Sequence, residues 1–271
     1  MNNSTFPKTI FKFENACKQS IINFKSQVLY MASPIAFNDP YDCAINMKIA
    51  DLKYSDIARI KKKYLERSDV PIKIKHEIES TNDEKMKSIL YKAVEKTIFE
   101  KRDEFLNNYG VCCFSEDNEN LLMWAHYSES YKGFCLEFNT NKEPFNKIRK
   151  VEYLESIPEF DIASYIIDGQ GDQILKLFCT KAENWKYEKE WRLLHKEANT
   201  KYSYCAESLK AIYFGPRIEP ELKEILCLIL LGQNLDVDLY NSKLGKECYS
   251  IKFDKFEYLP YIEAKRRGLR E

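Results

Sequence analysis

Residues 184–194 carry the sequence NWKYEKEWRLL, in which two glutamates one residue apart stand among aromatic residues and an arginine. If this segment is a β-strand, alternation puts Glu188, Glu190 and Arg192 on one face and mainly aromatic and leucine side chains on the other. Like charges that share a partly desolvated place raise the pKa of a carboxyl group, which is common at functional sites. The same pattern also fits an edge strand with a solvated charged face and an internal Glu–Arg ion pair. This segment alone leaves both interpretations open.

The composition indicates a globular protein and argues against several classes. Of 271 residues, 44% are hydrophobic and 31% are charged, which is enough apolar material for a sizeable core. Lys+Arg and Asp+Glu both number 42, so no overall basic field points to non-specific binding of nucleic acid. The nine cysteines are scattered without a C-x-x-C pair, which argues against structural zinc and predicts mostly buried thiols. Because no cleavable signal sequence and no long apolar run are evident, we expect a cytoplasmic protein that does not span a membrane.

Hydrophobic periodicity predicts strands mixed with helices. We expect strand, helix and strand over residues 10–32, and a charged helical region over residues 54–108 that forms an insertion or lid on a single domain of residues 1–271. Without a steady β-α-β rhythm, the pattern favours an α+β fold with a mixed, mainly antiparallel sheet. The other expected strands are 110–115, 133–138, 147–153 (paired with 133–138), 184–194, 209–214, 235–240 and 247–254, and the other expected helices are 120–127, 159–180 and 220–231.

Several common catalytic motifs are absent from the sequence. It has no P-loop, no G-x-G-x-x-G fingerprint, no H-E-x-x-H helix and no G-x-S-x-G elbow, which argues against kinases, Rossmann dehydrogenases, zinc proteases and α/β-hydrolases. What remains is a set of polar and aromatic clusters. In residues 33–42, Asp39 and Asp42 either shape a rigid turn or hold a cation. Cys113 and His126 would form a nucleophile–base pair only if the fold brought them within reach.

Several segments together resemble the bacterial domain-of-unknown-function 2971 family. They run in the order expected for that family through most of residues 10–215. The family name itself implies no activity. The segments are FKF (11–13), SPIAFNDPYD (33–42), CFS (113–115), MWAHY (123–127), GFCLEF (133–138) and YEKEWR (187–192).

The order of these residues is also similar to that of the ADP-ribosyltransferases, which bind NAD in the cleft of a split sheet. The resemblance implies that Lys12 lies near the phosphates or ribose of NAD, and that Tyr30 or Ser33 lies near the nicotinamide. It further implies that Glu190 accepts the 2′-hydroxyl of the nicotinamide ribose and stabilises an oxocarbenium-like transition state, while Glu188 orients the acceptor. Two departures stand out: Lys12 replaces the usual His or Arg, and the usual Ser-Thr-Ser run is missing.

The first functional hypothesis is therefore an NAD-dependent, ADP-ribosyltransferase-like enzyme of the kind used as a toxin or phage-defence effector. NAD would be its co-substrate, no metal is expected, and the acceptor, a protein or a nucleic acid, stays open. Besides the residues already named, His126 and the two aromatic residues Trp124 and Tyr127 are expected to line the ligand site.

Two other hypotheses remain. A non-catalytic module would hold a nucleotide-like ligand in an aromatic pocket formed by Trp124, Tyr127, Trp185 and Trp191. A nuclease would arrange Asp39, Asp42, Glu188 and Glu190 around Mg²⁺. The nuclease is least favoured, because the sequence lacks metal-ligand spacing and is not basic.

Overall fold

The computed structural model describes residues 6–43, 48–169 and 172–269. These residues divide into two compact units. The sheet unit comprises Met1–Ala32, Gly110–Val151 and Asn184–Glu271, and the helical unit comprises Ser33–Tyr109 and Glu152–Glu183. The single-domain organisation expected for residues 1–271 stays a prediction.

The sheet unit is built on an eight-stranded sheet with the order β14-β13-β12-β5-β1-β4-β10-β6. Strands β12 and β13 pair in parallel, and the other neighbours pair antiparallel. This confirms the expected α+β fold with a mixed, mainly antiparallel sheet. The strands are β1 (Thr9–Glu14), β4 (Gly110–Ser115), β5 (Phe134–Asn139), β6 (Arg149–Lys150), β10 (Glu190–His195), β12 (Leu209–Phe214), β13 (Asp238–Leu244) and β14 (Ile251–Phe256). A separate antiparallel pair joins β2 (Val28–Met31) to β11 (Thr200–Ser203).

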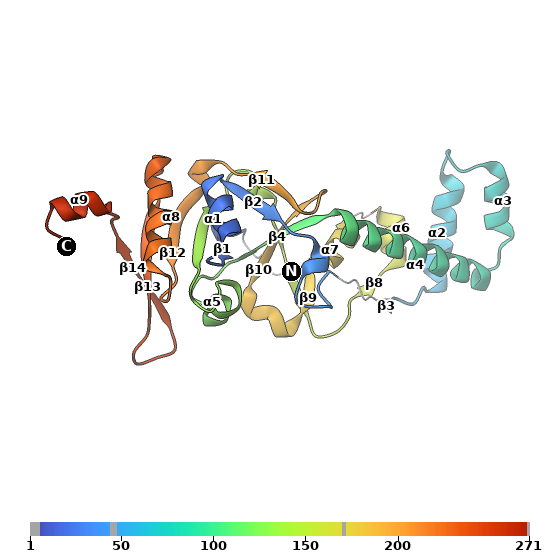
Figure 1. Ribbon diagram of the computed structural model, residues 1–271. Coiled ribbons are helices and arrows are strands. Elements are labelled where there is room, and N and C mark those ends of the chain that lie inside the picture. Colours follow the sequence, from blue (N-terminus) through green and yellow to red (C-terminus); the bar gives the residue numbers. More distant parts are fainter. Residues whose placement is uncertain (1–5, 44–47, 170–171, 270–271) are drawn as a thin grey trace. The chain divides into compact units, whose positions relative to one another are not determined.

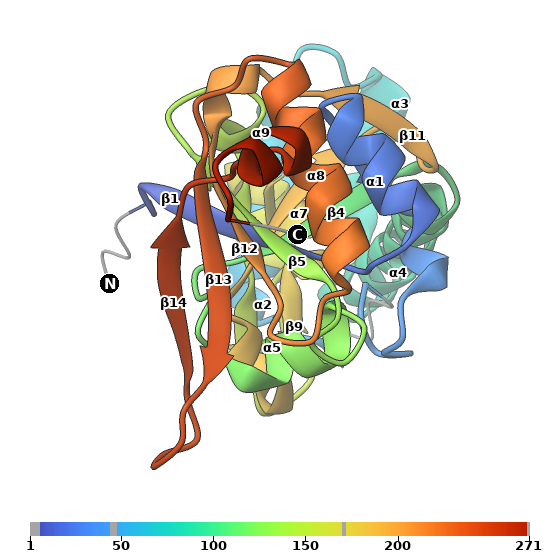
Figure 2. The same cartoon turned by 60° about the vertical axis from the view of Figure 1, so that its left-hand side comes forward.

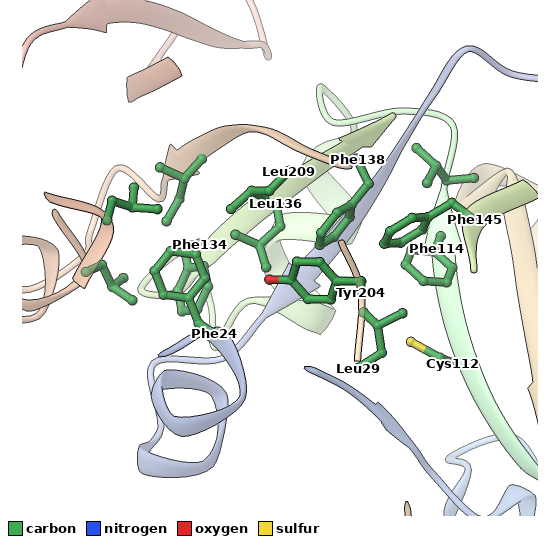
Figure 3. Packing of buried hydrophobic residues seen from close by; sticks show 14 of the residues in the cluster. Phe24, Leu29, Cys112, Phe114, Phe134, Leu136, Phe138, Phe145, Tyr204 and Leu209 are labelled. Carbon is green, nitrogen blue, oxygen red and sulfur yellow. The ribbon is translucent and has the colours of Figure 1, made fainter. Parts of the chain in front are cut away.

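Each face of the large sheet buries its own set of apolar side chains. Helices α1 (Lys18–Lys25) and α8 (Pro220–Gly232) lie side by side on what we name the α1/α8 face (Figure 2). There Phe24 of α1 packs with Phe134, Leu136 and Phe138 of β5, and Tyr204 reaches into the same cluster (Figure 3). The opposite face, named the α5 face, carries a second cluster that includes residues of α5 (Leu121–Tyr127). Helix α9 (Tyr261–Arg266) lies near the C-terminus.

Local sequence explains where the elements beside the site begin. The side chain of Asn120 accepts hydrogen bonds from the backbone N–H groups of Leu122 and Met123, which starts α5. Just before β5, a Cβ on Gly133 would lie 2.0 Å from the carbonyl oxygen of Glu14, so this position has room only for glycine. These contacts fix the start of α5 and hold Gly133, the residue before β5, close to Glu14 of β1.

In the helical unit, the expected charged helices are present. They are α2 (Tyr54–Glu66), α3 (Ile72–Ser80) and α4 (Asp83–Asn108) (Figure 1). Asn82 caps α4 by accepting from the N–H of Lys85. Their role as an insertion or lid stays a prediction. The unit also contains α6 (Ile162–Asp168), α7 (Asp172–Leu177), β3 (Lys48–Ile49), β7 (Glu152–Leu154), β8 (Glu159–Phe160) and β9 (Thr180–Ala182). The helical unit also contains the short 3-10 turn η1 (Pro34–Ala36). The 3-10 turns η2 (Phe145–Lys147) and η4 (Ala206–Ser208) belong to the sheet unit.

Two sequence predictions about these elements were wrong. The helix expected over residues 159–180 is interrupted, because Gly169 ends α6 in a left-handed conformation and strands β8 and β9 occupy its ends. The strand expected over residues 147–153 is divided into β6 and β7, which pair with β10 and β9 instead of β5. Pairing partners depend on contacts distant in sequence, which periodicity does not report. Among the residues that the structure describes, no helix combines the length and apolarity needed to cross a bilayer.

Candidate functional site

Strand register decides which of the predicted site residues share a face of the sheet. Glu190 of β10 lies opposite Ser115 of β4, and Phe11 of β1 lies opposite the same serine. Because directly paired residues point to the same side of a sheet, Glu190 and Phe11 share the α5 face. Lys12 follows Phe11 and therefore points to the α1/α8 face. The structure thus does not bring Lys12 and Glu190 together.

Glu190 is held by Arg192 in a buried ion pair. The Arg192 guanidinium donates from Nε to Oε1 at 2.7 Å and from Nη2 to Oε2 at 3.0 Å, a two-point contact that satisfies both carboxylate oxygens. Glu190 is 3% exposed and Arg192 is 0% exposed. The Glu–Arg pair predicted in one interpretation is present, but it is neither solvated nor on an edge strand, since β6 lies outside β10. Both charges are already compensated, which suits a positioning role for this pair.

Glu188 is not on the strand, contrary to the sequence prediction. Residues Glu183–Glu188 form the 3-10 helix η3, and β10 begins only at Glu190, after Lys189 with a φ of 45°. Side chains from the end of β4 and from the N-cap of α5 hold this turn: Ser115 Oγ donates to the Glu188 carbonyl at 2.6 Å, and Asn120 Nδ2 donates to the Tyr187 carbonyl at 2.9 Å. These contacts form between segments about 70 residues apart, so they override the local alternation.

The carboxylate of Glu188 meets a group of rings. The Tyr127 hydroxyl donates to Glu188 Oε1 at 2.5 Å. Around this bond lie four rings that we name the aromatic cluster: His126 and Tyr127 of α5, and Trp185 and Tyr187 of η3. Ring centroids are 6.3 Å apart for His126–Tyr127, 6.5 Å for His126–Tyr187 and 6.0 Å for Trp185–Tyr187. His126 is exposed and the other three rings are partly exposed, so the cluster presents flat apolar surface beside a buried acid, Glu188, which is 3% exposed.

Lys12 instead belongs to a polar group on the α1/α8 face. Its Nζ lies 2.7 Å from Glu14 Oε1, and Ser20 Oγ donates to Glu14 Oε2 at 2.8 Å. Burial alone would lower the pKa of Lys12, but attraction to Glu14 outweighs it and raises that pKa above the ordinary lysine value. Lys12 therefore stays charged and paired. Tyr204, which is 6% exposed, lies in the same core.

The two residues expected near the nicotinamide have local partners. Tyr30 lies on β2 of the two-stranded sheet, and its hydroxyl donates to Asn199 Oδ1 at 2.9 Å. Ser33 is the N-cap of η1, where its Oγ accepts from the N–H of Ile35 at 3.4 Å. Asp39 Oδ1 accepts from the N–H of Tyr41 at 2.9 Å, as expected for a rigid turn. Each of these contacts explains its residue as a structural element of a strand or turn.

The aromatic pocket expected from Trp124, Tyr127, Trp185 and Trp191 is not formed as predicted. Trp124 is 0% exposed and its Nε1–H donates to the carbonyl of Asn118, so its ring is part of the core. Trp191 alternates with Glu190 and Arg192 and packs into the α1/α8 face. Tyr187 takes their place in the aromatic cluster. No separate signal in the sequence pointed to Tyr187, whose ring the structure places 6.0 Å from that of Trp185 and 6.5 Å from that of His126.

Because neighbouring residues of a strand point to opposite faces of the sheet, we expect the thiols of Cys112 and Cys113 to differ in reactivity. Cys112 points to the α1/α8 face, where burial raises its pKa to about 11, whereas Cys113 is exposed. At about pH 8 we expect iodoacetamide to alkylate Cys113 at least about tenfold faster than Cys112, because the thiolate is the nucleophile. The Cys112 rate should rise only as the pH approaches its raised pKa. Tandem mass spectrometry follows the label on the peptide that carries both residues, and Cys113→Ser should remove the fast phase from that peptide. Equal labelling would contradict the register on which the separation of Lys12 and Glu190 rests.

The carboxylates considered for a metal-dependent nuclease have other partners. Glu188 contacts Tyr127, Glu190 contacts Arg192, and Asp42 forms an ion pair with Lys181. In residues 6–43, 48–169 and 172–269, no group of three or more His, Cys, Asp or Glu side chains is arranged to hold a metal ion. The described contacts therefore give the nuclease hypothesis no support.

Fold and site together define an α+β protein with an aromatic cluster beside a tyrosine-bound glutamate. Residues 123–193 match the model of a family described as a protein of unknown function, DUF2971. The matched segment contains the aromatic cluster, Glu188 and the Glu190–Arg192 pair, and it supports the family resemblance seen in the sequence. No curated protein and no solved structure matches this chain.

Proposed function

We propose that the aromatic cluster binds a planar, nucleotide-like ligand next to Glu188. The observation that carries this proposal is the Tyr127–Glu188 hydrogen bond of 2.5 Å, set among rings that are partly exposed. Aromatic faces stack on planar ring systems, and a carboxylate beside them accepts hydrogen bonds from ribose hydroxyls or base amines. Tyr127 fixes the orientation of the carboxylate, so the site is prepared before the ligand arrives.

A second candidate, ADP-ribosyl transfer from NAD, is favoured by the same bond. In that reaction the bond between nicotinamide and ribose C1′ breaks, nicotinamide leaves with the electron pair, and an acceptor nucleophile bonds to C1′. A carboxylate beside the ribose stabilises the positive charge that develops there. Glu188 suits this role by its position in η3 beside the partly exposed rings, whereas Glu190 lies within β10 in the pair with Arg192. The acceptor would be a protein or a nucleic acid, and such an activity would suit a toxin or phage-defence effector.

One experiment tests both candidates. The full chain is titrated with NAD, ADP-ribose and ribose 5-phosphate, and thermal unfolding is recorded while nicotinamide release is measured in the same samples. At about hundredfold excess over Kd, NAD and ADP-ribose should raise the Tm by about 5 °C, and ribose 5-phosphate, which has no ring system, should not. Tyr187→Ala should remove most of this shift. The matched control is Tyr249→Ala, since Tyr249 is fully exposed away from the aromatic cluster.

Nicotinamide release decides between the candidates. Release that Glu188→Gln abolishes and the exposed control Glu129→Gln leaves unchanged supports transfer. A Tm shift without release supports binding alone. If neither NAD nor ADP-ribose shifts the Tm, or if Tyr249→Ala lowers the shift as much as Tyr187→Ala, the aromatic cluster is not the ligand site.

A further inference from the structure

The helical unit contains a pocket that plays no part in the function proposed above. Its volume is about 340 Å³. Strand β7 lies along β9 in parallel register, with Leu154 opposite Ala182, and the loop after β7 returns over them. Tyr41 and Cys43 approach from a third segment of the same unit. The apolar walls are Leu154, Ile157, Pro158, Leu177 and Ala182.

A buried ion pair and the exposed carboxylate of Glu155 supply charge to this otherwise mainly apolar pocket. Lys181, which lines it, lies with its Nζ 3.3 Å from Asp42 Oδ2, and their side chains are 4% and 3% exposed. Two nearby polar groups are turned to the backbone: Thr180 Oγ1 donates to the Leu177 carbonyl at 2.8 Å, and the Cys43 thiol lies 3.8 Å from the Phe178 carbonyl. The pocket therefore combines a buried lysine, whose charge Asp42 compensates, with the exposed polar side chains of Glu155 and Ser156.

These features define the chemistry of a ligand. The volume lies at the lower end of the range for small-molecule pockets, which are mainly apolar with a few convergent polar groups. The Lys181–Asp42 pair carries no net charge and the Glu155 carboxylate lines the pocket, so an added anion would meet Glu155 at a cost. We propose that this pocket binds a small uncharged molecule with an apolar body and one amide or hydroxyl end. The ammonium of Lys181 contacts the oxygen of that polar end, and the walls enclose the body.

The test uses benzamide, a neutral ring with one amide, and benzoate, which has the same shape and a negative charge. Each is titrated into the full chain while saturation-transfer NMR records binding. We expect saturable binding of benzamide, and binding of benzoate that is at least about tenfold weaker, because its carboxylate would lie near Glu155 and Lys181 is already paired with Asp42.

Variants locate the binding. Ile157 is 41% exposed at the pocket, and Ile157→Ala should weaken benzamide binding about fivefold by removing apolar contact. The matched control is Ile89→Ala, since Ile89 is 47% exposed on α4 and does not line the pocket. Ala182→Leu should fill the pocket and abolish binding, and circular dichroism checks that this variant is folded.

Three results would overturn the proposal: no saturable benzamide binding, tighter binding of benzoate than of benzamide, or an equal loss in Ile89→Ala and Ile157→Ala. None of them bears on the aromatic cluster, whose ligand is tested separately with NAD and ADP-ribose. The proposals for the two sites can therefore be supported or contradicted independently of each other.

Discussion

Replacing Arg192 with Met should lower the free energy of unfolding by about 3–5 kcal/mol. The substitution leaves the Glu190 carboxylate, which is 3% exposed, without the two hydrogen bonds that Arg192 donates. An uncompensated charge in that position is costly, because desolvation is no longer offset by attraction to the guanidinium. Urea unfolding followed by circular dichroism measures the change.

Two variants show whether the loss of stability comes from the Glu190 carboxylate that is left without Arg192. Lys243 pairs with Asp254 at 2.5 Å on the exposed β13–β14 hairpin, so Lys243→Met should cost less than about 1 kcal/mol. The double variant with Arg192→Met and Glu190→Leu should recover much of the lost stability, since it removes both charges. A loss for Arg192→Met no larger than that of the exposed control would mean that the pair is not desolvated.

Replacing Trp124 with Ala should cost about 3–5 kcal/mol of stability, the usual effect of removing a large buried aromatic side chain. Trp124 is 0% exposed, its ring meets Phe13 edge-on at a centroid distance of 5.2 Å, and its Nε1–H donates to the Asn118 carbonyl at 2.7 Å. The cavity would open beneath α5 and disturb the turn that carries Tyr127. Denaturant unfolding of the purified variant measures the loss.

Trp185→Ala provides the comparison for this second prediction. Trp185 belongs to the aromatic cluster and is only partly buried, so its removal should cost no more than about 1–2 kcal/mol while reducing the Tm shift caused by NAD. The two tryptophans should thus separate a core role from a ligand-binding role. If Trp124→Ala were as stable as the parent and lost only ligand binding, the ring would have to be accessible, contrary to its burial.

Sequence patterns predicted much of the fold because many elements are encoded locally. The alternation of Trp191 and Leu193 against Glu190 and Arg192 is correct, since both apolar residues lie in the core of the α1/α8 face. The charged helices of residues 54–108 also formed as their helix-forming composition and the Asn82 cap indicate. Hydrophobic periodicity and helix capping depend on residues only a few positions apart, and a sequence shows such local relations directly.

The candidate site shows the limit of that information. Glu188 was predicted on the strand, but the loop that begins at Ser115 holds it in η3, and Tyr127 binds its carboxylate. Trp124 was predicted at the ligand and lies in the core. No local pattern distinguishes a tryptophan that fills a core from one that lines a surface.

Residues 190–194 by themselves specified a strand with an acid–arginine face and an apolar face, because alternation needs only the chain's own geometry. Tertiary structure decided everything that involves a second segment. The register of β1 against β4 places Lys12 on the face opposite Glu190, and a shift of one residue would have reversed this. Glu190 lies within β10 in the pair with Arg192, whereas Glu188 lies in η3 beside the partly exposed rings of the aromatic cluster. That difference makes Glu188, and not Glu190, the residue on which the proposed function rests.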